Sequence, residues 1–234
     1  MLGQIENELT LLSNPEKAKK LSSFFKTGKG EYGEGDVFIG IRVPILRGIV
    51  KNYYDLSLPK IQELLKSDIH EHRLGGLFIL NHKYQKASDE DKANIFNFYL
   101  NNTKNINNWD LVDLSAPNIV GDFLFDKDKK VLYGLANSND LWKKRIAVVS
   151  TFSFIRKNEF EDILAISELL LKDKHDLIHK AVGWMLREVG KREKNILKDF
   201  LKEHYENIPR TTLRYAIEKF EEDERKKWLR GELD

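Results

Sequence analysis

Residues 70–100 read HEHRLGGLFILNHKYQKASDEDKANIFNFYL and hold two helical patterns separated by a capping sequence. Apolar side chains recur at intervals of three and four residues, the spacing that places them on one face of an α-helix. They are Leu74, Leu77 and Phe78 in the first pattern and Ile95, Phe98 and Tyr99 in the second. Ser88, followed three residues later by the acidic Asp91, is typical of a helix N-terminus. The stretch predicts helices over 70–84 and 88–101.

The rest of the chain continues this alternation of short helices and short connections. Pro15, Pro44 and Pro59 each stand where the first turn of a helix is expected, a position that does not need the missing N–H. Two helices are expected within 4–26, and others near 59–66, 109–117, 128–137, 141–156, 160–171, 177–191, 193–204, 209–219 and 221–230. Such lengths favour stacked helical pairs, and a spacing of roughly 35–40 residues per pair suits a HEAT-type solenoid.

Composition narrows the class of protein. Five prolines and fourteen glycines are too few for an all-β fold of 234 residues, and no Gly-, Pro- or Ser-rich linker divides the chain. We therefore expect an all-α fold in a single domain, 1–234. The absence of cysteine excludes disulfides, thiolate zinc sites and cysteine nucleophiles, and fits a reducing cytoplasm. Neither a signal peptide nor a membrane span is expected, because the necessary apolar runs are missing.

A glycine-rich segment, 27–36, carries four glycines in eight residues and predicts a loop. Its spacing does not match G-x-x-x-x-G-K-[ST] and no strand clearly precedes it, so we exclude a nucleotide-binding loop. Its backbone amides suit a DNA phosphate, and an ordinary connection between helices explains the segment equally well.

Trp109 and Asp113 lie four residues apart in the stretch INNWDLVDL, residues 106–114. In a helix both side chains share one face, while Leu111 and Leu114 point to a different, buried side. An aromatic ring beside a carboxylate suits a cation, because both attract positive charge. The alternative is that Trp109 belongs to the core and Asp113 pairs with a lysine.

Two later stretches carry further aromatic and basic residues. Residues 142–147 follow the pattern W-x-x-R-x-A, and residues 180–188 follow K-A-x-G-W-x-L-R-E. Together with the W-x-x-V-D pattern that starts at Trp109, and with the loop sequence before Pro44, they resemble the AlkD family of bacterial DNA glycosylases. The resemblance runs from about Phe24 to Glu224. It implies a right-handed solenoid of antiparallel HEAT-like pairs with a concave basic face.

The resemblance also implies a reaction and the residues that perform it. By position, Asp113 matches the catalytic aspartate, Trp109 and Trp184 the two cleft tryptophans, and Arg145 the supporting arginine. A purine alkylated at N3 or N7 is cationic and departs as a neutral base. Its removal therefore needs an electrostatic partner for the oxocarbenium-like sugar and a positioned water, and one carboxylate can serve both needs. No lysine is placed to form an imine, so base removal without strand cleavage is expected.

The basic residues point to the DNA backbone. Residues 126–202 hold 17 Lys and Arg against 12 Asp and Glu, which fits a phosphate footprint and also fits an ordinary solvated face. Arg187 and Lys191 share a helix face with Trp184 and suit phosphate contacts, as do Lys143 and Lys144, although a surface ion pair explains Arg187 equally well. Glu188 is expected to be a structural partner rather than a second catalytic acid.

No metal or cofactor is expected. His175 and His179 have the i, i+4 spacing of a metal pair, but no third ligand accompanies them. The expected partner is double-stranded DNA containing alkylated bases, with no membrane, and the protein is expected to be a monomer in the bacterial cytoplasm, at the nucleoid when it acts. The sequence pattern shows no enclosed pocket for a flipped base. The resemblance to the AlkD family implies that the damaged base stays in the duplex. The alternative function is a non-catalytic HEAT-like scaffold that binds nucleic acid or protein.

Overall fold

The computed structural model describes residues 2–232 of the chain, and within that range every regular element is helical. An isolated parallel bridge joins Val37 to Ile69 and forms no strand. The all-α prediction is confirmed. None of the helices in the described range is long and apolar enough to cross a membrane.

The chain divides into two compact units. The N-terminal unit ends at Ser115 and the C-terminal unit begins at Ala116. Each is described below by itself. The expectation of a single domain over 1–234 remains a prediction, as do the right-handed sense of the solenoid and its concave basic face.

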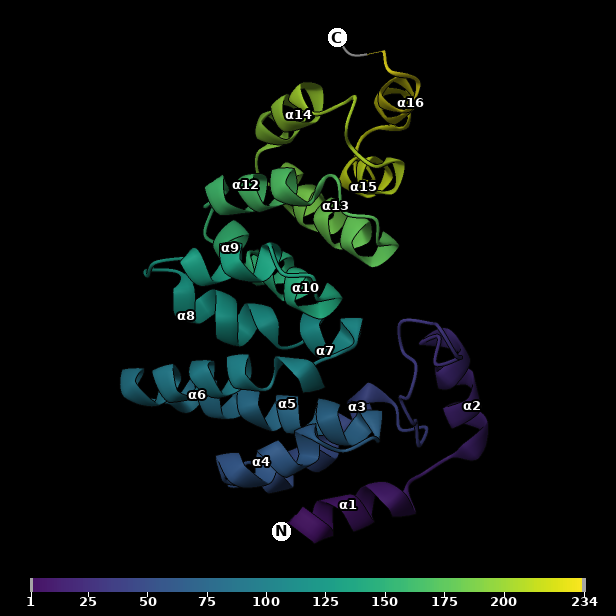
Figure 1. Cartoon of the computed structure of the whole chain (residues 1–234), viewed down its shortest axis with the longest axis vertical. Helices are drawn as coiled ribbons and strands as arrows, with labels where there is room; N and C mark the ends of the chain where they lie inside the picture. The colour runs from purple at the N-terminus through teal and green to yellow at the C-terminus, as the bar shows by residue number, and fades with distance from the viewer. Residues whose placement is uncertain (1, 233–234) are drawn as a thin grey trace. The chain divides into compact units, whose positions relative to one another are not determined.

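The N-terminal unit consists of helices with mostly short connections, apart from the long segment 25–42 between α2 and α3, and α5 and α6 lie side by side (Figure 1). Its elements are α1 (Leu2–Leu11), α2 (Pro15–Phe24), α3 (Val43–Val50), η1 (Lys51–Tyr53), α4 (Leu58–Leu65), α5 (His70–Lys86), α6 (Asp89–Asn101), η2 (Thr103–Asn105) and α7 (Trp109–Asp113). The predicted caps are present: Pro15 opens α2 behind the Asn14 cap, and the Ser88 side chain accepts the N–H of Asp91 at the start of α6.

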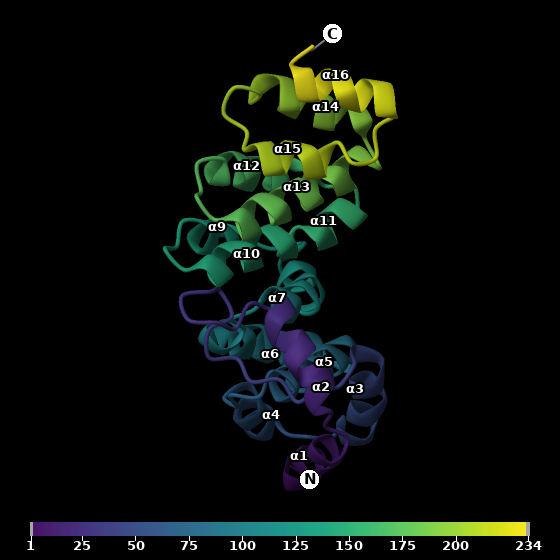
Figure 2. The same ribbon diagram turned by 90° about the vertical axis from the view of Figure 1, so that its right-hand side faces the viewer.

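Helix α5 is the centre of the N-terminal unit, and most of its side chains are buried. Gly75 and Gly76 let neighbouring helices approach it closely. A Cβ at Gly76 would lie 3.3 Å from the Cβ of Leu64 on α4, and one at Gly75 would lie 3.4 Å from Val50 on α3. Helix α2 behaves differently: it lies on the outside of the unit, in front of α5 and α3 in Figure 2, and buries none of its own side chains.

The C-terminal unit is also built of paired helices. Its elements are η3 (Pro117–Gly121, a π-helix), α8 (Asp122–Leu124), α9 (Lys130–Ala136), α10 (Leu141–Ser150), α11 (Phe152–Arg156), α12 (Glu161–Leu170), α13 (Asp176–Gly190), α14 (Lys194–Glu203), α15 (Arg210–Ala216) and α16 (Glu222–Arg230). Gly183 brings α13 against α15, since a Cβ there would lie only 2.6 Å from the carbonyl oxygen of Thr212. This contact fixes the helix that carries Trp184.

Two boundaries differ from the predicted ones. The helix expected over 141–156 is divided at Thr151 into α10 and α11. The Trp109 helix, expected to break near Pro117, already ends at Asp113, and Pro117 lies in the first turn of the next helical segment. This place is favourable for proline because its missing N–H is not needed there.

Candidate functional site

Trp109 begins the five-residue helix α7, and Asp113 ends it. The Asn108 side chain caps this helix by accepting the N–H of Trp109 at 2.8 Å. Leu111 is fully buried as predicted, whereas Leu114 is only half-buried and does not belong to the core. Trp109 and Asp113 are both half-buried, so each keeps part of its surface open to solvent. Trp109 is therefore not a core residue.

One face of the Trp109 ring is covered by Phe25. The two rings are parallel within 7°, with centroids 5.0 Å apart, and Phe24 meets Trp109 edge-on at 5.9 Å. The stack continues inward from Phe25 to Phe38 at 4.8 Å, and from Phe38 to the imidazole of His70 at 4.4 Å. Phe25 also lies 5.1 Å from His70, so Phe25, Phe38 and His70 form a cluster of three rings behind the candidate substrate-binding tryptophan.

His70 lies between two buried carboxylates. Its Nδ1 donates to Asp36 at 3.0 Å and its Nε2 donates to Asp110 at 2.8 Å, so the ring carries both protons and a positive charge. Burial lowers the pKa of His70, but the hydrogen bonds to Asp110 and Asp36 outweigh it and raise this pKa to about 9. The N-terminal unit thus contains a buried imidazolium held between two carboxylates.

Asp36 gathers the other members of this network. It accepts a hydrogen bond from Asn108 at 2.9 Å and forms an ion pair with Arg73. Burial works to raise the pKa of Asp36, yet His70, Arg73 and Asn108 together hold it below its ordinary value. Since Asn108 and Asp110 flank Trp109 in the chain, the network fixes the start of α7 to α5 and to the end of the glycine-rich loop. Sequence reasoning missed it, although Asp36 in the loop and Asp110 beside Trp109 were visible signals.

Side chains within the glycine-rich loop accept hydrogen bonds from some of the loop's own backbone amides. The amides of Gly28 and Gly30 donate to the carboxylates of Glu31 and Glu34. Just after the loop, Glu71 of α5 accepts the amides of Ile39, Gly40 and Ile41 at 2.8–3.2 Å. Because these amides already donate to carboxylates, they favour an ordinary connection between helices over a phosphate-binding loop.

Asp113 lies near the buried phenol of Tyr99. Burial raises the pKa of Tyr99, and the negative charge of Asp113 raises it further, against the effect of a hydrogen bond with Ser115. The carboxylate of Asp113 therefore acts over a low-dielectric region, where its charge interacts more strongly than in water.

In the C-terminal unit, Arg145 is 5% exposed and links two helices. From α10, its guanidinium donates to the carbonyl oxygen of Leu177 on α13 at 2.7 Å. Its neighbour Lys144 forms an ion pair of 2.6 Å with Asp173, while Lys143 is half-buried on the same helix. The ammonium group of Lys144, which was predicted to contact a DNA phosphate, is therefore already paired with a carboxylate.

Trp184, Arg187 and Lys191 all belong to the α13 region, as their spacing predicts. Trp184 is half-buried, and its ring centroid lies 5.8 Å from that of Phe152, a neighbour that the sequence did not suggest. Arg187 pairs with Glu218 of the segment after α15. Arg187 thus forms the kind of ion pair that was the alternative to a phosphate contact.

Glu188 is buried among cations, as expected of a structural partner. Lys191 lies 2.6 Å from it, and Arg187 and Arg192 lie 3.7 and 3.9 Å away. The structure thus brings Trp109 and Asp113 together on α7, Arg145 with Lys143 and Lys144 on α10, and Trp184 with Arg187 on α13.

The histidine pair in the C-terminal unit is engaged in backbone contacts. His175 caps α13 by accepting the N–H of Leu177 through Nδ1, and His179 donates from Nε2 to the carbonyl oxygen of Asp173. Across residues 2–232, no three His, Asp or Glu side chains form a group that could hold a metal ion.

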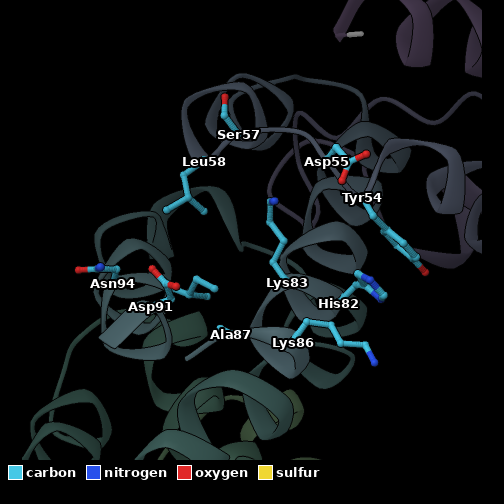
Figure 3. Close-up of a pocket in the computed structure, with 11 residues that line it drawn as sticks. Tyr54, Asp55, Ser57, Leu58, His82, Lys83, Lys86, Ala87, Asp91 and Asn94 are labelled. Carbon is cyan, nitrogen blue, oxygen red and sulfur yellow. The ribbon is translucent and has the colours of Figure 1, made fainter. Parts of the chain in front are cut away.

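The N-terminal unit contains a hollow of about 470 Å³ between α4, α5 and α6 (Figure 3). Figure 3 shows Lys83 pointing into it, and the rings of Tyr54 and His82 stack at its edge with centroids 3.5 Å apart. Neither this hollow nor the one under α2 described below is lined by Trp109 or Asp113.

Comparison with known proteins identifies the family. No curated protein matches the chain. A solved structure, "Predicted DNA alkylation repair enzyme from Enterococcus faecalis", is similar to it with a TM-score of 0.69 and 18% sequence identity, over 90% of this chain and 97% of that chain. At this identity the likeness shows the fold alone. The family model of the DNA alkylation repair enzymes, however, matches residues 5–220, and the chain therefore belongs to that family.

Proposed function

We propose that this protein is a monofunctional DNA glycosylase that hydrolyses the N-glycosidic bond of N3- or N7-alkylated, positively charged purines in duplex DNA. The observation that carries the proposal is the pair on α7. A half-buried carboxylate, Asp113, accompanies a half-buried tryptophan ring on a helix whose start is fixed by a buried ionic network. Membership of the DNA alkylation repair family supports DNA as the substrate.

The reaction follows from the charge of the lesion. When the bond between C1′ and the base nitrogen breaks, its electron pair neutralises the cationic base, and positive charge develops on the deoxyribose. Asp113 stabilises that charge and accepts a proton from the water that attacks C1′. The open part of the Trp109 surface contacts the sugar or the cationic nucleotide. The base leaves without a proton donor, and the DNA strand stays intact.

Arg145 and Trp184 take their proposed roles from the resemblance of their motifs. Trp184 contacts the same class of substrate through its half-buried ring, and Arg145 supports the site through its planar, hydrogen-bonding guanidinium. Arg187, Lys191, Lys144 and Lys143 are proposed DNA-backbone contacts. For three of them, DNA binding requires an exchange of ion-pair partners, because Lys144, Arg187 and Lys191 are paired with Asp173, Glu218 and Glu188.

The ion pairs of Lys144, Arg187 and Lys191 favour a second candidate function, that of a non-catalytic scaffold.

One experiment distinguishes the glycosylase from the scaffold. Duplex DNA containing N7-methylguanine is incubated with the protein, and free base is measured by chromatography. The glycosylase proposal predicts release above the spontaneous rate with no strand breaks. Release equal to the protein-free control, together with retained DNA binding, would establish the scaffold. We further propose a monomer acting on nucleoid DNA in the cytoplasm.

A further inference from the structure

A second hollow, of about 450 Å³, lies beneath α2 in the N-terminal unit, and we call it the α2 hollow. Its walls are mainly apolar side chains from α2, from the segment 38–43 and from α5. They include Leu21, Phe25, Phe38, Ile41, Val43 and Leu74. The hollow is open to solvent, and its volume is that of a small organic ligand.

Three cations line the same hollow. Lys17 and Lys20 lie one turn apart on α2, and Arg42 is the N-cap residue of α3. Within residues 2–232 none of them forms an ion pair, whereas Lys144, Arg187 and Lys191 are all paired. Arg42 also leaves the start of α3 without a side-chain cap. Two carboxylates, Glu71 and Asp110, also line the hollow, but Glu71 accepts the backbone amides of 39–41 and Asp110 is paired with His70. The three cations therefore fit an anionic group in a bound molecule.

Both walls of the α2 hollow are held in place, because the start of α2 packs directly on the segment 39–41: the Asn14 amide donates to the Ile39 carbonyl oxygen at 2.8 Å, and a Cβ at Gly40 would lie 2.2 Å from the Asn14 carbonyl oxygen. Glu71 ties the backbone of 39–41 through three hydrogen-bonded amides. Opposite, α2 buries none of its own side chains, and its N-terminus is capped by Asn14, whose side chain accepts the N–H of Lys17 at 2.9 Å. A helix that covers apolar space without filling it is suited to packing against a ligand.

We propose that the α2 hollow binds a small organic anion, with its apolar body against the aliphatic walls and its carboxylate or phosphate head on Lys17, Lys20 and Arg42. Phe25, Phe38 and His70 pack against one another with centroids 4.4–5.1 Å apart on one side of the hollow, and the remaining apolar lining is aliphatic. Because Phe25 also stacks on Trp109, an occupant of the hollow alters the surroundings of that tryptophan.

The test uses anilinonaphthalene sulfonate as a fluorescent probe and decanoate as a competitor, with the folded full-length protein. The probe should bind with enhanced fluorescence, and decanoate should displace it. The double variant Lys20→Glu with Arg42→Glu should bind the probe about tenfold more weakly or worse. The matched control, Lys19→Glu with Lys51→Glu, carries the same charge change at two exposed positions outside the hollow and should stay within about twofold of wild type.

A third variant tests the apolar chamber without touching charge. Leu21→Trp enlarges a half-buried side chain of α2 toward the hollow and should abolish displacement by decanoate while far-UV circular dichroism and the melting temperature stay close to wild type. Equal probe binding in both double variants would overturn the proposal, as would displacement by acetate or inorganic phosphate as strong as that by decanoate. Loss of duplex DNA binding in Lys20→Glu with Arg42→Glu, with probe binding intact, would assign these cations to DNA instead. None of these readouts requires glycosylase activity.

Discussion

Phe25 stacks on Trp109 with the two ring planes parallel within 7° and their centroids 5.0 Å apart. Phe25 is buried, so the orientation of the half-buried tryptophan is set from inside the N-terminal unit. Aromatic pairs of this kind contribute about 0.5–1.5 kcal/mol beyond their buried area. The stack therefore holds the candidate substrate-binding ring in one position before DNA arrives.

Phe25→Leu should lower the rate of base release by up to about tenfold, because the leucine fills space without orienting the Trp109 ring. Trp109 fluorescence should also change. Phe24→Leu is the matched control: Phe24 is 65% exposed and meets Trp109 only edge-on, so its effect should be smaller. A greater loss of rate in Phe24→Leu than in Phe25→Leu would contradict the role of the stack.

Asp113→Asn should reduce base release about a hundredfold or more, because the variant keeps the shape of the side chain but removes its charge. DNA binding and the melting temperature should stay close to wild type. Asp110→Asn, on the same helix, should instead lower the melting temperature, since Asp110 holds the His70 imidazolium. Undiminished release by Asp113→Asn would eliminate the proposed mechanism.

Folding stability should fall as the pH rises from about 6.5 to about 9. The pKa of His70 is raised from 6.5 to about 9 in the folded state, so the folded state holds its proton more tightly than the unfolded chain does. The stabilisation is fully present below pH 6.5 and is lost as the pH passes through 9, amounting to at most about 3 kcal/mol. Urea unfolding at several pH values measures this. His70→Gln should show a flatter dependence over that range, and an identical slope in both proteins would exclude His70 as its source.

Trp109→Ala and Trp184→Ala should each cost less stability than Trp228→Ala. Trp228 is 3% exposed, and cutting a buried tryptophan to alanine costs about 3–5 kcal/mol. The two half-buried tryptophans should cost about half as much, and their variants should fold but lose base release. Denaturant unfolding of the three variants provides the comparison. A protein unfolded at room temperature by Trp184→Ala would show that this ring belongs to the core.

The lesion should be selected by its own charge. In matched duplexes, N7-methylguanine and a bulky N7-alkylguanine should both be released, since each carries the positive charge that lets the base depart neutral. Uracil and hypoxanthine should remain, because their neutral bases need leaving-group activation. Release of uracil at a rate near that of N7-methylguanine would contradict this, as would complete exclusion of the bulky cationic adduct.

Local signals predicted the fold well. Ser88 and Pro15 begin helices as expected, because capping and proline geometry depend only on neighbouring residues. The division at Thr151 escaped prediction because the apolar periodicity continues through it. The pairing of helices depends on close approaches such as Gly183 to Thr212, which no local pattern reveals.

The candidate site was predictable only in part. Trp109 and Asp113 share a helix, so their spacing placed them together. The ionic network joins Asp36, His70 and Asp110, which are separated by 34 and 40 residues, and no local pattern indicates that these residues pair. The same holds for Arg187 and Glu218, 31 residues apart. The net charge of a stretch of sequence therefore does not show which of its basic residues already form an ion pair with a distant acidic residue.

Glu71 accepts the backbone amides of three consecutive residues, Ile39, Gly40 and Ile41, in a segment without regular secondary structure. Amide hydrogens exchange with solvent only when such bonds open. These three amides therefore share the opening equilibrium of a single buried carboxylate, and they should exchange as one cooperative group. The segment 39–41 should therefore open together with the part of α5 that carries Glu71.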